Sequence, residues 1–113
     1  MTSQETGQLG EEGPGLSVRP EGDALVLSGE LDLATAHILQ SALERHRGDG
    51  DLTLDLAGLS FMDSTGIKIL ITAARMLEGR GCLILRSPAP PIRRVLELVQ
   101  LDRVPGVKVE YLE

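Results

Sequence analysis

The fold is decided by the stretch Leu54-Asp55-Leu56-Ala57-Gly58-Leu59-Ser60-Phe61-Met62-Asp63-Ser64-Thr65-Gly66-Ile67-Lys68-Ile69-Leu70, because its hydrophobic period changes along the way. Before the change, apolar residues alternate with polar ones, as in a strand with one buried face: Leu52, Leu54 and Leu56. After it, they follow the spacing of one helix face: Ile67, Leu70, Ile71, Ala74 and Leu77. The quartet Asp63-Ser64-Thr65-Gly66 between them contains residue types that cap helix starts. The sequence therefore predicts a buried strand that runs into a polar turn and then into a helix.

Length and composition describe a single globular domain. The chain has 113 residues, is 42% apolar, and contains no apolar run near the roughly 18 residues that a membrane span needs. Its formal net charge of −6 opposes a phosphate backbone, and Phe61 and Tyr111 are its only aromatic residues, so nucleic acid is not an expected partner. No export signal opens the chain and Cys82 is its single cysteine, which favours the cytoplasm.

Three regions precede this junction. Residues 1–15 are polar and rich in Gly, which is typical of a disordered leader, so the folded domain is expected over residues 16–113. Two short strands, within 16–18 and 24–29, are separated by turn residues and predict a hairpin. Asp32 is expected to cap a helix from Leu33 to about Arg47. One face of that helix is predicted to consist of Ala36, Leu39, Ala42, Leu43 and His46.

The regions after the junction complete an α/β pattern. The junction helix is expected to run from Ser64 to about Glu78, and the apolar run 82–85 predicts a central parallel strand buried on both faces. A further helix stripe follows: Ile92, Val95, Leu96 and Val99. Val107, Val109 and Tyr111 predict a last edge strand. Strands that alternate with helices predict a mixed, mainly parallel sheet of four to five strands, opened by a hairpin, with the helices packed on one face.

No metal, cofactor or catalytic site is predicted. His37 and His46 have no neighbouring groups at the spacing of a zinc site, and Cys82 is expected to behave as a small hydrophobe. Gly79-Arg80-Gly81 closes a helix and lacks the Lys and Ser/Thr of a phosphate-binding loop. Ser64 lacks the G-x-S-x-G surroundings of a hydrolase nucleophile, so an enzyme is not expected.

Ser64 itself has two interpretations. A serine at a helix start is common as a cap and carries no switch by itself. The same position suits a phosphate acceptor, because the free N–H groups and partial positive charge of a helix N-terminus favour a phosphoryl group. The serine alone favours the cap, and the longer sequence pattern changes that balance.

Three blocks of sequence form this longer pattern: Gly29-Glu30-Leu31-Asp32 with Thr35-Ala36, the segment 54–66, and Ile92-Arg93-Arg94-Val95-Leu96-Glu97-Leu98 with Leu101-Asp102. Together they resemble the motifs of the STAS domain family, and more narrowly those of bacterial anti-sigma factor antagonists, over about residues 16–111. By this resemblance Ser64 is the serine that an anti-sigma factor, itself a serine kinase, phosphorylates, with Thr65 as the alternative acceptor. Asp63 is then the neighbouring acid, and Gly66 lets the helix start approach closely. Lys68 stands where such antagonists often have glycine, and it is expected to influence which kinase docks.

The resemblance implies regulation of transcription by partner switching. The unphosphorylated chain would bind the anti-sigma serine kinase and free the sigma factor, phosphorylation at Ser64 would release the kinase, and a serine phosphatase would reverse the change. No cofactor and no membrane insertion are implied. The alternative is a STAS interaction module that is never phosphorylated, in a signalling scaffold or a transporter or lipid-trafficking complex, where Ser64 is only a cap.

A second apolar stripe on the junction helix is a candidate docking surface: Ile69, Ala73 and Met76. At about 100° per residue it points away from the core stripe, so we expect it to be partly exposed beside Asp63, Ser64, Thr65, Gly66 and Lys68. The alternative is that it packs sideways against the first or third helix.

Overall fold

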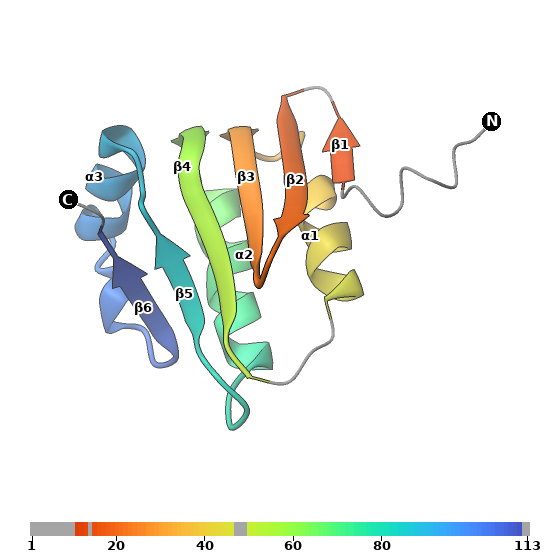
Figure 1. The fold of residues 1–113 in the computed structure, drawn as a ribbon. Helices are drawn as coiled ribbons and strands as arrows, with labels where there is room; N and C mark the ends of the chain where they lie inside the picture. Colours follow the sequence, from red (N-terminus) through yellow and green to blue (C-terminus); the bar gives the residue numbers. More distant parts are fainter. Residues whose placement is uncertain (1–10, 14, 47–49, 112–113) are drawn as a thin grey trace.

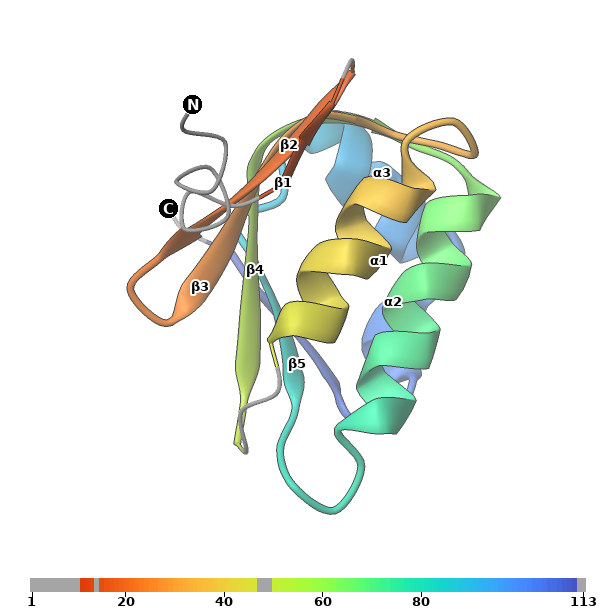
Figure 2. The same ribbon diagram turned by 90° about the vertical axis from the view of Figure 1, so that its right-hand side faces the viewer.

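In a computed structural model, which describes residues 11–13, 15–46 and 50–111, the chain forms one mixed sheet with α-helices on one of its faces (Figure 1, Figure 2). The strands lie in sequence order: β1 (Glu11–Gly13), β2 (Leu16–Glu21), β3 (Ala24–Leu31), β4 (Leu52–Met62), β5 (Leu83–Arg86) and β6 (Val107–Glu110). The pairs β1–β2 and β2–β3 are antiparallel, and β3–β4, β4–β5 and β5–β6 are parallel. The predicted α/β class, with its hairpin and mainly parallel sheet, is confirmed.

The prediction that residues 1–15 form a disordered leader is wrong for residues 11–13. Glu11–Gly13 forms β1, which pairs antiparallel with Leu16–Val18 of β2 and gives the sheet one strand more than predicted. An edge strand can be held by backbone hydrogen bonds, so it needs none of the apolar residues on which the prediction depended. Residues 1–10 and 14 of the predicted leader lie outside the described residues.

The long central strand β4 contains two irregularities in its pairing with β3. The register shifts between the pairs Val26–Asp55 and Ser28–Gly58, and again before the pair Glu30–Phe61. Each shift gives β4 an extra residue, as in a β-bulge, so the spacing of its buried side chains lengthens. These buried residues are Leu52, Leu54, Leu56, Leu59 and Met62. The shifts therefore keep an apolar side chain on the helix side up to the point where the chain leaves the sheet.

The helices are α1 (Ala36–Arg45), α2 (Ser64–Met76) and α3 (Pro90–Leu98), followed by the 3-10 turn η2 (Leu101–Arg103). Figure 2 shows α1, α2 and α3 in one layer against the sheet. α2 begins at the predicted residue. α1 begins later than predicted, at Ala36 instead of Leu33. Asp32 Oδ1 accepts a hydrogen bond from Thr35 N at 3.1 Å, so its carboxylate closes a turn before the helix instead of capping the helix itself. The predicted helix end near Arg47 lies outside the described residues, since 47–49 are not among them.

The core lies between the helix layer and the sheet and is built mostly from leucine, including fully buried Leu27, Leu39, Leu54, Leu70 and Leu85. Since helices cover only one face, β5 is not buried on both faces as predicted: Leu83 and Leu85 are buried, whereas Ile84 is partly exposed.

Two residues predicted on buried helix faces are exposed. His46 lies beyond the end of α1, and Val99, 47% exposed, is the C-cap of α3. Neither residue lies within a helix, so the helical spacing on which the predictions depended does not extend to it.

Candidate functional site

Asp63 caps the start of α2. This residue is the N-cap, with extended backbone, and its Oδ1 accepts hydrogen bonds from Thr65 N at 2.9 Å and Gly66 N at 3.4 Å. These bonds satisfy two N–H groups that an uncapped helix start would leave free. The expectation that Ser64 is a cap is therefore wrong: Ser64 is the first residue of the helix, and its side chain has no capping role.

Ser64 is exposed, and its hydroxyl makes no hydrogen bond to the described part of the chain. Thr65, the alternative acceptor, is partly buried. Because Asp63 performs the capping, the Ser64 hydroxyl can react or bind without loosening the helix start. The exposed position makes Ser64 accessible to a second protein.

Gly66 allows the helix start to pack closely against the ends of two strands. A Cβ at Gly66 would lie 2.6 Å from Met62 Cγ and 2.9 Å from Leu31 Cδ2, well inside van der Waals contact. The turn is also tied to β3, since Asp63 N donates to Leu31 O at 3.2 Å. The role given to Gly66 by the resemblance, a close approach of the helix start, agrees with this packing.

The neighbouring turn before α1 supports the same edge of the sheet. Thr35 is 4% exposed; its hydroxyl donates to Glu30 O at 2.8 Å and accepts from Asp32 N at 3.0 Å. These residues belong to the first block of the sequence resemblance. Two exposed apolar residues also lie near the ends of the strands, Leu33 (78%) and Phe61 (47%), which the sequence analysis did not select. The sequence contains one weak signal for each: Leu33 is an apolar residue in a polar turn, and Phe61 lies where the alternation of apolar and polar residues in β4 is interrupted.

The predicted docking stripe on α2 is wrong for two of its three residues. Ile69 and Ala73 are buried, with 7% and 6% exposure, whereas Met76 is 62% exposed. α1 lies beside α2 in the helix layer and covers this side of it, which is the sideways packing considered as the alternative (Figure 2). On the core stripe, Leu70, Ala74 and Leu77 are buried as predicted, while Ile67 and Ile71 are only partly buried at its margin.

Lys68 is exposed on the side of α2 opposite the core. It lies one turn after Ser64, an i,i+4 pair, so the two side chains share one side of the helix. Of the residues predicted to form the site, the structure brings Asp63, Ser64, Thr65, Gly66 and Lys68 together and separates Ile69, Ala73 and Met76 from them.

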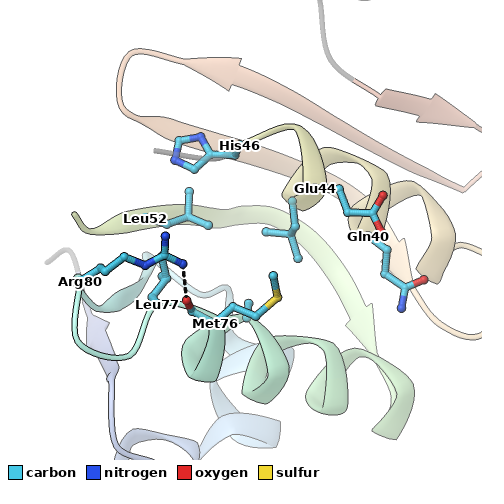
Figure 3. Close-up of a pocket in the computed structure, with 9 residues that line it drawn as sticks. Gln40, Glu44, His46, Leu52, Met76, Leu77 and Arg80 are labelled. Atoms are coloured by element: carbon cyan, nitrogen blue, oxygen red, sulfur yellow. Dashed lines mark hydrogen bonds between the residues drawn. The ribbon is translucent and has the colours of Figure 1, made fainter. Parts of the chain in front are cut away.

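Met76 belongs instead to a pocket at the other end of α2 (Figure 3). This cavity of about 410 Å³ lies between the C-terminal ends of α1 and α2. Its lining residues are Gln40, Leu43, Glu44, His46, Leu52, Ala73, Met76, Leu77 and Arg80. One edge is shaped by Arg80, whose guanidinium donates to Met76 O at 2.7 Å. Met76 lies twelve positions after Ser64 on α2, a rise of about 18 Å at 1.5 Å per residue, so the pocket is not part of the Ser64 site.

The remaining candidates do not assemble a site. His37 and His46 are exposed, and Cys82 is partly exposed just before β5, where its backbone N donates to Asp51 Oδ1 at 2.8 Å. Within 11–13, 15–46 and 50–111, no group of three or more His, Cys, Asp or Glu residues is placed to hold a metal ion. None of the helices in these ranges is long and apolar enough to span a membrane.

Sequence comparisons relate the chain to a family and to named proteins. The profile of the family described as "Mlab, STAS domain" matches residues 15–110. An anti-sigma F factor antagonist of Lysinibacillus sphaericus is 35% identical over 75 residues, which are 63% of this chain and 64% of that protein. An anti-sigma-B factor antagonist of Listeria monocytogenes is 30% identical over 87 residues, 74% of this chain and 76% of that protein.

Solved structures of similar fold carry the same description. The crystal structure of an anti-sigma factor antagonist from Mycobacterium paratuberculosis matches with a TM-score of 0.63 at 28% identity, over 82% of this chain and 83% of that one. The anti-sigma factor antagonist SpoIIAA in its unphosphorylated form matches with a TM-score of 0.59 at 25% identity, over 83% of this chain and 86% of that one.

Proposed function

Because this chain belongs to the STAS domain family, we propose that it is an anti-sigma factor antagonist that acts by partner switching. Unphosphorylated, it binds an anti-sigma serine kinase and thereby frees the sigma factor. Phosphorylation of Ser64 releases the kinase, and a serine phosphatase restores the binding form. The chain is the substrate in this cycle and works in the cytoplasm, where sigma factors act.

One observation carries the proposal: Ser64 is exposed at the first position of α2 while Asp63 performs the capping. A kinase needs a hydroxyl that it can reach and that the fold does not use. The helix start also favours the phosphoryl group, since its N–H groups and dipole carry partial positive charge. The descriptions of the relatives as anti-sigma factor antagonists support the same function.

Phosphorylation would change the docking surface strongly. A phosphoserine carries about −1.5 to −2 charge at pH 7 and three acceptor oxygens. Next to the Asp63 carboxylate, the phosphate group fills space that a partner would occupy. Its negative charge also repels any acidic group of the partner. A tenfold loss of affinity requires only about 1.4 kcal/mol, which a new charge at the centre of an interface can supply.

The test is phosphorylation by the anti-sigma kinase encoded nearest to the gene of this chain. The purified chain, incubated with that kinase and ATP, should gain one phosphate on Ser64 by mass spectrometry. Ser64→Ala should gain none and should stay bound to the kinase in the presence of ATP, and Ser64→Glu should bind at least tenfold more weakly than wild type. Thr65→Ala is the matched control and should be phosphorylated like wild type.

Two outcomes contradict the proposal. Phosphate on Thr65 or elsewhere in Ser64→Ala would move the acceptor. If the chain binds a partner stably and is phosphorylated under no condition tested, the alternative of a STAS module that is never modified is favoured.

A further inference from the structure

The charges of the chain are divided unevenly along its length. Residues 1–63 carry 12 Asp and Glu against 3 Lys and Arg, whereas residues 64–108 carry 8 Lys and Arg against 3 Asp and Glu. The second segment begins at Ser64 and contains α2, α3 and η2. A protein with a formal net charge of −6 therefore has a basic half that begins at its candidate phosphorylation site.

Part of this positive charge is gathered on the outer side of two helices. On α2, Lys68 and Arg75 are exposed and lie opposite the buried residues Leu70 and Ala73, and α2 contains no acidic residue. On α3, Arg94 is exposed and lies opposite buried Ile92 and Leu96. Figure 2 shows that both helices pack on the same face of the sheet. Since the three cations lie opposite the buried sides of their helices, we infer that they lie on the outer side of the helix layer.

Lys68, Arg75 and Arg94 form no ion pair with the described part of the chain. Other basic residues there are paired: Arg86 with Asp55, and Arg93 with Glu97. Arg93, next to Arg94, is further engaged by the ring of Tyr111 at 4.2 Å. Apolar surface accompanies the free cations, since Leu98 of α3 is 76% exposed and Ile71 of α2 is partly buried between Lys68 and Arg75.

We propose that this basic helix face, formed by Lys68, Ile71, Arg75, Arg94 and Leu98, docks an acidic surface of the anti-sigma factor. The inference rests on the proposed function and names the surface and the chemistry of its partner. Charge complementarity carries it: an acidic surface is attracted to this face and repelled by the acidic remainder of the chain, so long-range attraction also orients the encounter. Leu98 and Ile71 offer apolar area that contact can then bury.

The same face explains how phosphate on Ser64 acts. Ser64, Lys68, Ile71 and Arg75 follow the spacing i, i+4, i+7 and i+11, so they form one outer stripe of α2. A phosphate on Ser64 lies within reach of the Lys68 ammonium, and its charge of about −1.5 to −2 cancels more than one of the three cations. The modified face attracts an acidic partner less, so association slows.

The experiment measures association rates with the anti-sigma factor encoded nearest to the gene, in low and high salt. The test variant is Lys68→Glu with Arg94→Glu, and the control is Arg19→Glu with Lys108→Glu. The control makes the same change in net charge, at exposed residues of β2 and β6 whose neighbours Val18 and Val107 are buried on the helix side. Thermal unfolding verifies that both variants are folded.

We expect the test variant to associate at least tenfold more slowly than wild type in low salt and the control less than threefold more slowly. In about 0.5 M salt, where screening acts over only a few ångströms, the rates should converge. If the test and control variants associate at equal rates while wild type still binds the kinase and is phosphorylated on Ser64, the docking role of the basic helix face is wrong. The proposed function is then unaffected. A second measurement follows the binding of wild type and of the test variant to vesicles rich in anionic lipid. If the test variant binds these vesicles more weakly than wild type but associates with the anti-sigma factor at the wild-type rate, the basic helix face is not a docking surface for the anti-sigma factor. If wild type neither binds nor is phosphorylated, the proposed function fails, and this inference fails with it.

Discussion

Two neighbouring turns of the molecule use similar residues for opposite purposes. Before α1, the Thr35 hydroxyl is buried and bonded to Glu30 O and Asp32 N. Before α2, the cap is the Asp63 carboxylate, and the Ser64 hydroxyl is exposed and bonded to no described residue. Both turns lead from parallel strands into helices at the same edge of the sheet. The first hydroxyl is used by the fold, and the second is exposed without a hydrogen-bond partner among the described residues.

The difference teaches how an exposed hydroxyl without a structural task can be placed on a stable element. A hydroxyl that caps a helix or closes a turn cannot be modified without losing its hydrogen bonds. When the capping is given to a carboxylate one residue earlier, the hydroxyl loses its structural task. Four substitutions test this division between the Thr35 turn and the Asp63 turn.

Gly66→Val should have the largest effect. Its Cβ would meet Met62 Cγ and Leu31 Cδ2 at 2.6 and 2.9 Å, and overpacking of this kind costs about 3 kcal/mol. For a domain of this size we expect the thermal midpoint to fall by about 12 °C or more, measured by circular dichroism. Thr72→Val at an exposed position of α2 is the control. A midpoint for Gly66→Val within a few degrees of the control would show that α2 can move away from the strand ends freely.

Thr35→Val should come next. It keeps the shape of the side chain but leaves Asp32 N and Glu30 O without their partner, which costs about 1–3 kcal/mol in the free energy of unfolding by urea. Thr65→Val makes the same change in the second turn, where the threonine hydroxyl has no partner among the described residues, and should cost less than about 0.5 kcal/mol. Equal losses in the two variants would remove the distinction between the turns.

Asp63→Ala should destabilise by about 1 kcal/mol, because Thr65 N and Gly66 N lose their acceptor. Asp63→Asn retains a side-chain oxygen and should stay within a few tenths of wild type in the same urea titration. If Asp63→Ala were as stable as Asp63→Asn, the carboxylate would not be the cap on which the helix start depends.

Ser64→Ala should have the smallest effect on stability. The lost hydroxyl has no described partner, so the free energy of unfolding should change by less than about 0.5 kcal/mol. Phosphate incorporation by the anti-sigma kinase should nevertheless be abolished. A loss of stability as large as that of Thr35→Val would mean that Ser64 has a structural role after all.

Much of this fold follows from local patterns. The change of period around Asp63 predicts β4, the turn and α2 in the correct order, and it places Ser64 at the first residue of the helix. These predictions succeed because strand alternation, helix spacing and capping preference act over a few residues. The STAS resemblance likewise rests on short local blocks, of which one, residues 54–66, covers most of β4, the turn and the start of α2, so the family could be predicted without knowledge of the packing.

Other features depend on contacts between segments that are distant in the sequence. Ile69 and Ala73 are buried because α1 lies beside α2, and a helical spacing alone cannot say which side has a neighbour. β1 is held by pairing with β2, which its composition does not reveal. The cap could have been Asp63 or Ser64 by residue type, and the backbone direction at the end of β4 selected Asp63. The basic helix face likewise depends on the packing of α2 and α3 on the same side of the sheet (Figure 2), because the exposed residues Lys68, Arg75 and Arg94 then lie on the outer side of one helix layer.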